Sequence, residues 1–226
     1  MKMEQTFPPV YAQPAAPTAL STNRVLRDTY LLLSATLFFS AAVTAASVAL
    51  KLPHPGIVVT LIGFFGLLYA TTKLRNSVWG LAAVFGLTGF MGYTLGPIIG
   101  HYLSMPNGHQ VVMMAMGGTA TIFVGLSAYA LTSRKDFSFM GGFLLAGIIV
   151  AFLAGLGAIF FQVPALSLTV SAVFVLLMGG LILFETSRII HGGETNYIMA
   201  TVSLYVSIYN LFSSLLALIG FGSNNE

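Results

Sequence analysis

The sequence contains no cysteine, and this absence removes three kinds of chemistry. Disulfide bonds, thiolate nucleophiles and cysteine-ligated metal sites all require the missing side chain. The absence does not indicate a cellular compartment.

Charged residues are also scarce. They make up 7% of the 226 residues, whereas hydrophobic residues make up 57% and the mean hydropathy is +0.91. Ordinary soluble domains carry about 25% charged residues, so this composition predicts an integral membrane protein. The net charge of +3 is small and the lysines and arginines are scattered, which argues against nucleic-acid binding. No long polar block is present, so we expect one membrane domain and no separate soluble domain.

Common catalytic motifs are missing as well. There is no HExxH motif, no glycine-rich phosphate loop and no pair of aspartates within a predicted span. The stretch GLSAYA around Ser127 is similar to the nucleophile region of an intramembrane serine protease, but no histidine lies deep within a predicted span to act as its base. We therefore expect no enzyme activity, no cofactor and no metal site.

The stretch HGGE, from His191 to Glu194, is a weak metal-binding pattern because it offers two ligands around a Gly-Gly turn. A pair of helix ends explains it better. Gly192 and Gly193 fit the end of one helix. Glu194 with Thr195 fits the start of the next, where a carboxylate interacts favourably with the helix N-terminus.

The sequence contains long uncharged segments. The charged residues between these segments allow the membrane spans to be counted. A charge in the middle of a bilayer is costly, so spans lie between charges. Two segments are too long for one span of about 20 residues and divide at the turn-like sequences SMPNGHQ and QVPALS. The segments lie at 29–50, 52–72, 76–133, 137–184 and 196–221, which predicts seven spans.

The predicted fold class is an all-α integral membrane protein with seven transmembrane helices. The apolar runs are continuous and lack the two-residue alternation of a membrane β-barrel. Residues 1–23 are rich in proline and alanine and do not resemble a signal peptide, so they are predicted to form a flexible cytoplasmic N-terminal tail. Residues 24–226 are predicted to form the seven-helix membrane domain.

The distribution of positive charge predicts the orientation. If seven spans alternate, eight of the nine Lys and Arg residues fall on one side and only Lys51 falls on the other. Positive residues collect on the cytoplasmic side. The N-terminus is therefore predicted to be cytoplasmic and the C-terminus to lie on the far side.

The third predicted span has a stripe of small residues. Gly89, Gly92, Gly96 and Gly100 follow the spacing i, i+3, i+7, i+11 and fall on one helical face. Such stripes allow membrane helices to approach closely. Pro97 in the same span predicts a kink.

Polar residues gather near the sixth and seventh spans. Glu185 and Arg188 can pair at i, i+3 near the cytoplasmic end of the sixth span. The seventh span carries a polar stripe with the spacing i, i+4, i+7, i+11, formed by Ser203, Ser207, Asn210 and Ser214. Ordinary polar packing between helices explains the stripe. The functional alternative is a gate, in which the stripe faces a closed cavity or leak path with Glu185 at its inner mouth.

Several stretches resemble one known family. The segment FETSRIIHGGETNYIMATVSLYVSIYNLF is similar to the C-terminal signature of the Bax inhibitor (TMBIM) family, and RVLRDTYLLLS, LTGFMGYTLGPII and GLSAYALTSRKDFSFMGGFL match its bacterial YccA branch. The resemblance runs from Arg24 to Gly220. It implies a Bax-inhibitor-like bundle with the C-terminal helix at its centre, in a Gram-negative inner membrane with a periplasmic C-terminus.

For the family at large, the resemblance implies a pH-sensitive calcium or cation leak controlled by two acidic residues. Glu185 stands at the first acidic position. Ser207, in LYVSIYN, stands where the family pattern LYxDIYN has its second acid. Two close carboxylates share a proton and titrate as a pair, whereas a Glu and a Ser do not. The leak, with calcium as its ion, is therefore the alternative function.

For the YccA branch, the resemblance implies association with the membrane protease FtsH and its partners HflK and HflC. The role implied is that of a substrate and a modulator that restrains the degradation of other membrane proteins. The predicted tail fits this role, since a protease motor needs an unfolded segment to grip. The leading function is thus a non-catalytic modulator of FtsH within the lipid bilayer.

Overall fold

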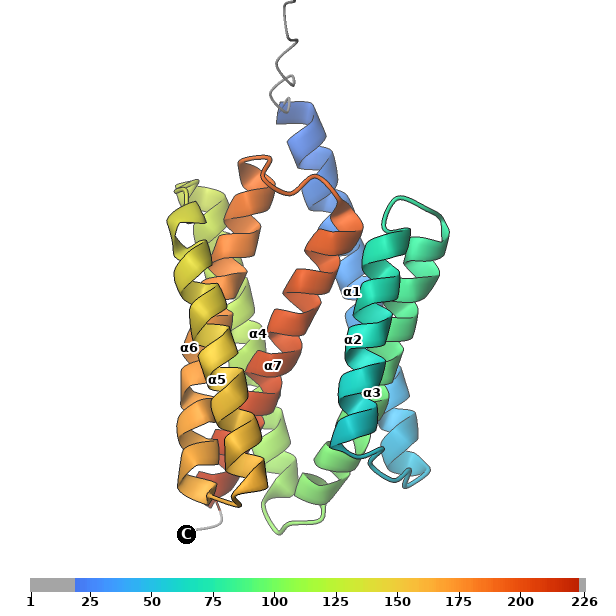
Figure 1. Ribbon diagram of the computed structural model, residues 1–226, viewed down its shortest axis with the longest axis vertical. Helices are drawn as coiled ribbons and strands as arrows, with labels where there is room; N and C mark the ends of the chain where they lie inside the picture. The colour runs from blue at the N-terminus through green and yellow to red at the C-terminus, as the bar shows by residue number, and fades with distance from the viewer. Residues whose placement is uncertain (1–18, 224–226) are drawn as a thin grey trace, which may run out of the picture.

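The computed structural model describes residues 19–223, and the regular structure of this part of the chain is entirely helical (Figure 1). Seven helices are long and apolar enough to cross a membrane. These are α1 (Ala19–Ala49), α2 (Ile57–Leu74), α3 (Trp79–Leu103), α4 (Gly108–Ser133), α5 (Gly141–Phe160), α6 (Pro164–Ile190) and α7 (Tyr197–Ser223), with a short 3-10 turn, η1 (Ser138–Met140), before α5. The predicted all-α fold with seven transmembrane helices is confirmed.

Helix α1 begins earlier than the sequence predicts. Residues 19–23, assigned to the tail by composition, belong to this helix, while residues 1–18 of the predicted tail lie outside the described residues. At about 1.5 Å per residue, a helix of 31 residues measures about 46 Å, longer than the roughly 30 Å hydrocarbon core of a bilayer. The N-terminal end of α1 accordingly projects beyond the neighbouring helices (Figure 1).

The helix connections alternate between the two ends of the bundle (Figure 1). The α2–α3, α4–α5 and α6–α7 connections lie at the end from which α1 projects. We call this the charged end, because its connections and flanking turns hold Lys73, Arg75, Arg134, Lys135 and Arg188. Lys51 lies at the opposite end, in the α1–α2 connection, where α7 also ends. The alternation assumed in the charge count is therefore present in the described chain.

Helix α7 lies in the middle of the bundle, with α4, α5 and α6 on one side and α1, α2 and α3 on the other (Figure 1). It packs against α1, α3, α4 and α6. Half of its most apolar stretch is buried within the protein, against 6% for α2. The central position expected for the C-terminal helix is thus observed, and α2 and α5 lie at the flanks.

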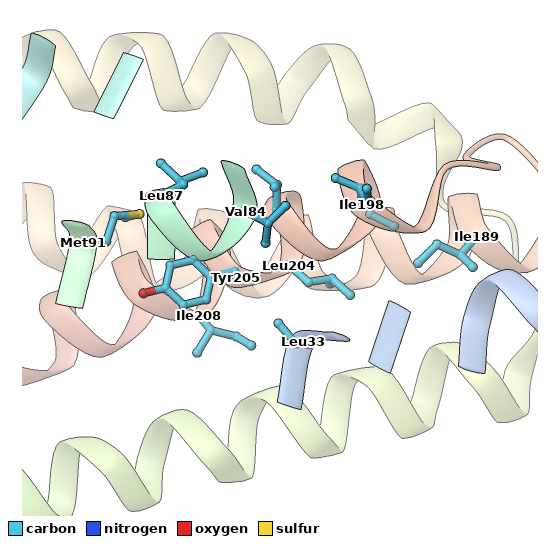
Figure 2. Packing of buried hydrophobic residues seen from close by; sticks show 11 residues of the cluster. Leu33, Val84, Leu87, Met91, Ile189, Ile198, Leu204, Tyr205 and Ile208 are labelled. Atoms are coloured by element: carbon cyan, nitrogen blue, oxygen red, sulfur yellow. The ribbon is translucent and has the colours of Figure 1, made fainter. Parts of the chain in front are cut away.

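The largest group of buried apolar side chains surrounds the first half of α7. It draws on α1, α3, α6 and α7, so it joins the two sides of the bundle. Because lipid tails are as apolar as these side chains, close packing and dispersion contacts stabilise it more than exclusion of water does. Figure 2 labels nine of its members, Leu33, Val84, Leu87, Met91, Ile189, Ile198, Leu204, Tyr205 and Ile208.

The glycine stripe of α3 faces α1 over most of its length. A Cβ on Gly92 would lie 2.5 Å from the carbonyl oxygen of Ser40, and a Cβ on Gly96 would overlap the side chain of Ser47. Gly89 meets Phe39 in the same way. Gly100 departs from the pattern, because no atom lies within 4 Å of its would-be Cβ. The predicted close packing therefore holds for three of the four glycines.

Pro97 lies inside α3 and has no N–H to donate to the carbonyl of Tyr93. The hydroxyl of Ser47 on α1 donates to that carbonyl at 3.2 Å. The close approach of α1 and α3 thus supplies a partner for the backbone group that the proline leaves unpaired. Buried carbonyl groups in a membrane require such a partner.

Candidate functional site

Arg188 is the centre of a small charged cluster at the end of α6. Its Nη1 lies 3.4 Å from both carboxylate oxygens of Glu185, one turn earlier, and its Nη2 lies 3.7 Å from Oε2 of Glu194. Nη2 also donates to the carbonyl of Gly193 at 3.3 Å. Glu185 is only 6% exposed, and a buried carboxylate requires a compensating positive charge. The pair suggested by the sequence is present, and Glu194 joins it as a second carboxylate.

Asn196 caps the first turn of α7. Its Oδ1 accepts hydrogen bonds from the backbone N–H groups of Ile198 and Met199, at 3.0 and 3.1 Å. Glu194 supports the cap, because its Oε1 accepts from the backbone N–H of Asn196 at 2.8 Å. The prediction that Glu194 and Thr195 begin this helix is wrong. Asparagine is among the strongest N-cap residues because its short side chain reaches the free amides of the first turn.

The same asparagine also joins two loops at the charged end. Its Nδ2 donates to Oδ1 of Asn76 at 2.9 Å and to the carbonyl of Arg75 at 3.1 Å. The α2–α3 connection is therefore held against the start of α7. The sequence gives little sign of this contact, since the partners are 120 residues apart.

The polar stripe of α7 is mostly satisfied within its own helix. Ser207 donates to the carbonyl of Ser203, and Asn210 donates to the carbonyl of Val206, each at 2.8 Å. Ser207 and Ser214 are buried, while Ser203 and Asn210 are half-buried. Among the described residues, no hydrogen bond or ion pair connects this stripe to Glu185. The two parts of the predicted site thus lie on adjacent helices without a polar contact between them.

Two tyrosines of α7 carry polar contacts that the sequence reasoning missed. The hydroxyl of Tyr205 lies 2.6 Å from Oγ of Ser40 and donates to the carbonyl of Thr88 at 3.2 Å. The hydroxyl of Tyr209, one turn later, lies 3.1 Å from Oγ1 of Thr94. These bonds connect α7 to α1 and α3. The spacing of the tyrosines in LYVSIYN was the available signal, because residues four apart share a helix face.

Ser187 and His191 fasten the α4–α5 connection to the end of α6. Nε2 of His191 lies 3.1 Å from the carbonyl oxygen of Arg134, and Nδ1 lies 2.9 Å from that of Ser187. Oγ of Ser187 donates to the carbonyl of Lys135 at 3.2 Å and accepts from the N–H of Phe137 at 3.0 Å. His191 therefore contacts backbone, and within the described residues no three His, Cys, Asp or Glu side chains gather as a metal site requires.

Asp136 is an exposed residue of the same connection. Its Oδ1 accepts from the backbone N–H of Ser138 at 2.8 Å. Hydrogen bonds from Ser138 lower the pKa of Asp136 below its ordinary value, and the nearby His191 adds a smaller effect in the same direction. The carboxylate thus favours its ionised form in the folded connection.

Ser127, which the sequence brings forward as a protease-like serine, lies on α4 and is buried. Its Oγ has no hydrogen-bond partner among the described residues. A serine nucleophile requires a base within hydrogen-bonding reach. The contacts of Ser127 within the described chain do not include such a base.

These features define the class of protein as a multi-pass helical membrane protein arranged around a polar C-terminal helix. The family model described as "Inhibitor of apoptosis-promoting Bax1" matches residues 22–225. The chain therefore belongs to the Bax inhibitor family.

Its relatives include bacterial membrane proteins. The chain is 57% identical over 206 residues to the Escherichia coli K12 protein named "Modulator of FtsH protease YccA", covering 91% of this chain and 94% of that protein. It has the same identity and coverage with the "Inner membrane protein YccA" of E. coli O6:H1. It is 56% identical over 202 residues to the Pseudomonas aeruginosa protein PA2604, covering 89% of this chain and 91% of that one.

Proposed function

We propose that the protein is a non-catalytic modulator of an FtsH-type protease in the inner membrane of a bacterium. The observation that carries the proposal is the 57% identity to the E. coli modulator over 91% of this chain. The aligned length requires that the similarity extends through the membrane domain and not through one motif alone. HflK and HflC, which the resemblance to the YccA branch implies, are proposed as further partners.

The proposed orientation places the N-terminus in the cytoplasm and the C-terminus in the periplasm. The positive residues gathered at the charged end support it, because such residues are retained on the cytoplasmic side. Fusion of a reporter after Glu226 tests it. We expect alkaline phosphatase to be active there and green fluorescent protein to be dark, while a bright fluorescent fusion contradicts the proposed orientation.

The N-terminal segment is the proposed handle for the protease and makes the protein itself a substrate. Helix α1 projects from the bundle at the charged end (Figure 1), and its residues Arg24 and Arg27 are exposed there. The proposed handle runs from residue 1 to about residue 21. Its last three residues belong to α1, and the composition of the preceding ones predicts an unstructured segment that a cytoplasmic motor can grip.

Deletion of residues 2–18 tests the handle while keeping α1 intact. In cells that contain FtsH we expect the lifetime of the shortened protein to increase several-fold, with unchanged membrane insertion. Deletion of residues 224–226 at the opposite end is the matched control, and it leaves the lifetime unchanged. Both deletions are repeated in cells depleted of FtsH. An unaltered lifetime of the N-terminal deletion with FtsH present contradicts the handle.

The modulator role itself has a separate test. Overproduction of the protein is expected to slow the degradation of another membrane substrate of FtsH, and co-purification in mild detergent is expected to recover FtsH with HflK and HflC. The deletion of residues 2–18 separates the two roles, because a modulator that acts through its membrane domain still slows degradation. Degradation at the normal rate with the full chain in excess contradicts the proposal.

A pH-sensitive calcium leak is the second candidate, favoured by the buried Glu185 and its contact with Arg188. The variant Ser207→Asp restores the acid of the family pattern. Like-charge repulsion and burial then favour a shared proton at mildly acidic pH. We expect this variant to gain pH-dependent calcium flux in liposomes, and Ser203→Asp, one turn away, to gain none.

Calcium flux through the unmodified protein distinguishes the two functions. We expect it to show little calcium flux between about pH 5 and pH 8. A restored pair of acids would titrate in this range, because coupling raises the pKa of one carboxylate by several units. Glu185→Gln should then change the flux hardly at all. Strong pH-gated flux through the unmodified protein makes the leak the leading function.

A further inference from the structure

A pocket of about 310 Å³ lies at the charged end, between α1, α4 and α6. None of the residues that line this pocket belongs to the Arg188 cluster. The lining residues are Thr22, Asn23 and Leu26 of α1, Leu131 and Arg134 at the end of α4, and Ile190 and His191 at the end of α6. None of the seven is acidic, so the pocket presents positive charge and polar groups above an apolar wall.

Arg134 is the principal charge of this pocket. Its guanidinium takes part in no ion pair or hydrogen bond with any residue that the structure describes. Its backbone is fixed in the left-handed region, at φ 49°, by a bond from its N–H to the carbonyl of Ala130 at 3.1 Å and by the contact of its carbonyl with His191 at 3.1 Å. A left-handed backbone is unfavourable for a residue with a side chain. The fold thus fixes the backbone of this lining residue, whose guanidinium is unpaired among the described residues.

Three buried hydroxyl groups lie one helical turn further into the bundle. Each is four residues from a residue that lines the pocket, and residues four apart share a helix face. None of the three has a hydrogen-bond partner within the described chain. They are Tyr30 on α1, Ser127 on α4 and Thr186 on α6. Buried hydroxyls without partners are uncommon and costly. These three atoms are closed to solvent and their residues do not line the pocket, so they are not among its donors.

We propose that this pocket binds a phosphate group, carried by a soluble phosphate compound or by the headgroup of an anionic phospholipid. The planar guanidinium of Arg134 matches two phosphate oxygens at once. Asn23 and Thr22 add hydrogen-bond donors at the mouth. No acidic side chain lines the pocket, and the carboxylate of Asp136, which lies near His191, is exposed outside it.

The first test uses inorganic phosphate as the probe and the full-length protein in detergent. Thermal unfolding is followed while phosphate replaces chloride at constant ionic strength. We expect a saturable rise in melting temperature for the natural protein. Arg134→Gln should weaken the apparent phosphate affinity roughly ten-fold, as expected for a charge-assisted hydrogen-bonding partner. The adjacent Lys135→Gln removes the same charge outside the pocket and should change the affinity less than about two-fold.

The second test distinguishes a lipid from a soluble ligand. The protein is reconstituted in nanodiscs of phosphatidylcholine with or without phosphatidylglycerol, and bound lipid is measured by native mass spectrometry. A lipid headgroup site retains phosphatidylglycerol in the natural protein and in Lys135→Gln, and loses it in Arg134→Gln. A site for a soluble phosphate compound shows no such retention but gives the phosphate response in detergent.

The buried hydroxyls have their own variant, Thr186→Val, which preserves the shape of the side chain and removes the hydroxyl. We expect it to change the binding of phosphate or phosphatidylglycerol less than about two-fold, because this hydroxyl does not line the pocket. The proposal is overturned if neither probe binds, or if Arg134→Gln and Lys135→Gln weaken binding equally. A several-fold loss of binding by Thr186→Val contradicts the assignment of the donors to the lining residues.

Discussion

The hydroxyl of Tyr205 lies 2.6 Å from Oγ of Ser40, joining the central helix α7 to α1 across 165 residues of sequence. The same hydroxyl reaches the carbonyl of Thr88 on α3. One side chain thus connects three helices in the buried part of the bundle. In a membrane such bonds contribute to helix association because apolar burial alone does not distinguish a neighbouring helix from lipid.

Removal of the Tyr205 hydroxyl should therefore loosen α7. We expect Tyr205→Phe to lower the free energy of unfolding by about 0.5–2 kcal/mol. Tyr209→Phe is the matched control with a smaller expected cost, because Thr94 keeps its second bond, to the carbonyl of Met91 at 2.8 Å. Denaturation in mixed detergent micelles measures both. Equal losses would show that the Tyr205 bonds contribute nothing beyond those of an ordinary buried tyrosine.

The glycine stripe of α3 gives a paired prediction. A methyl group at Gly96 would overlap Ser47, the residue that donates to the carbonyl of Tyr93, whereas a methyl group at Gly100 meets open space. We expect Gly96→Ala to destabilise the protein by about 1–3 kcal/mol, as overpacking does. Gly100→Ala should remain within about 0.5 kcal/mol of the natural protein. Thermal unfolding in detergent distinguishes them, and a neutral Gly96→Ala contradicts the close contact.

The cap of α7 can be separated from its loop contact. Asn196→Ala removes both, and we expect it to cost about 1–2 kcal/mol of stability. Asn76→Ala removes only the bond between the two side chains, so its cost should be about 1 kcal/mol or less. Hydrogen exchange of the first turn of α7 provides a local readout. If the two variants expose that turn equally, the capping role of Asn196 is wrong.

Asp136 gives a prediction of pH dependence. Its pKa is lowered in the folded protein from the ordinary 3.8, so its stabilising contribution is present above that value and is lost as the pH falls through the lowered pKa. Asp136→Asn keeps an oxygen for the Ser138 contact but has no charge. We expect the variant to be less stable than the natural protein at pH 7, with the difference disappearing in stronger acid. Thermal unfolding across the acid range measures it, and a difference independent of pH contradicts the assignment.

The number of spans was predictable from the sequence because a charge inside the bilayer is costly, so charged residues mark where a span cannot lie. Gaps between charges such as Asp28 and Lys51 therefore predict helices directly. The rotation of each helix was not predictable in this way. Leu31 is 63% exposed and Leu33 is 2% exposed, although both are leucines. Lipid and protein interior accept the same apolar side chains, so the sequence does not show which of the two faces the protein.

The candidate site was predictable only where its contacts are local. Glu185 and Arg188 stand one turn apart, so their pairing follows from helix geometry. The approach of Glu194 to Arg188 depends on the loop between α6 and α7, which turns at Gly192 with φ 73°. The four-residue spacing of Tyr205 and Tyr209 predicts that both lie on one face of α7, but their partners on α1 and α3 depend on tertiary packing.

The central position of α7 has a consequence for how the protein is made. Residues 197–223 follow the other six described long helices along the chain, so the faces of α1, α3, α4 and α6 that contact α7 lack this partner until it has been synthesised. Six helices must remain in the bilayer with these faces open to lipid or to one another. Insertion of α7 then completes the described bundle, and until that event the Ser40 hydroxyl and the Thr88 carbonyl lack their partner Tyr205.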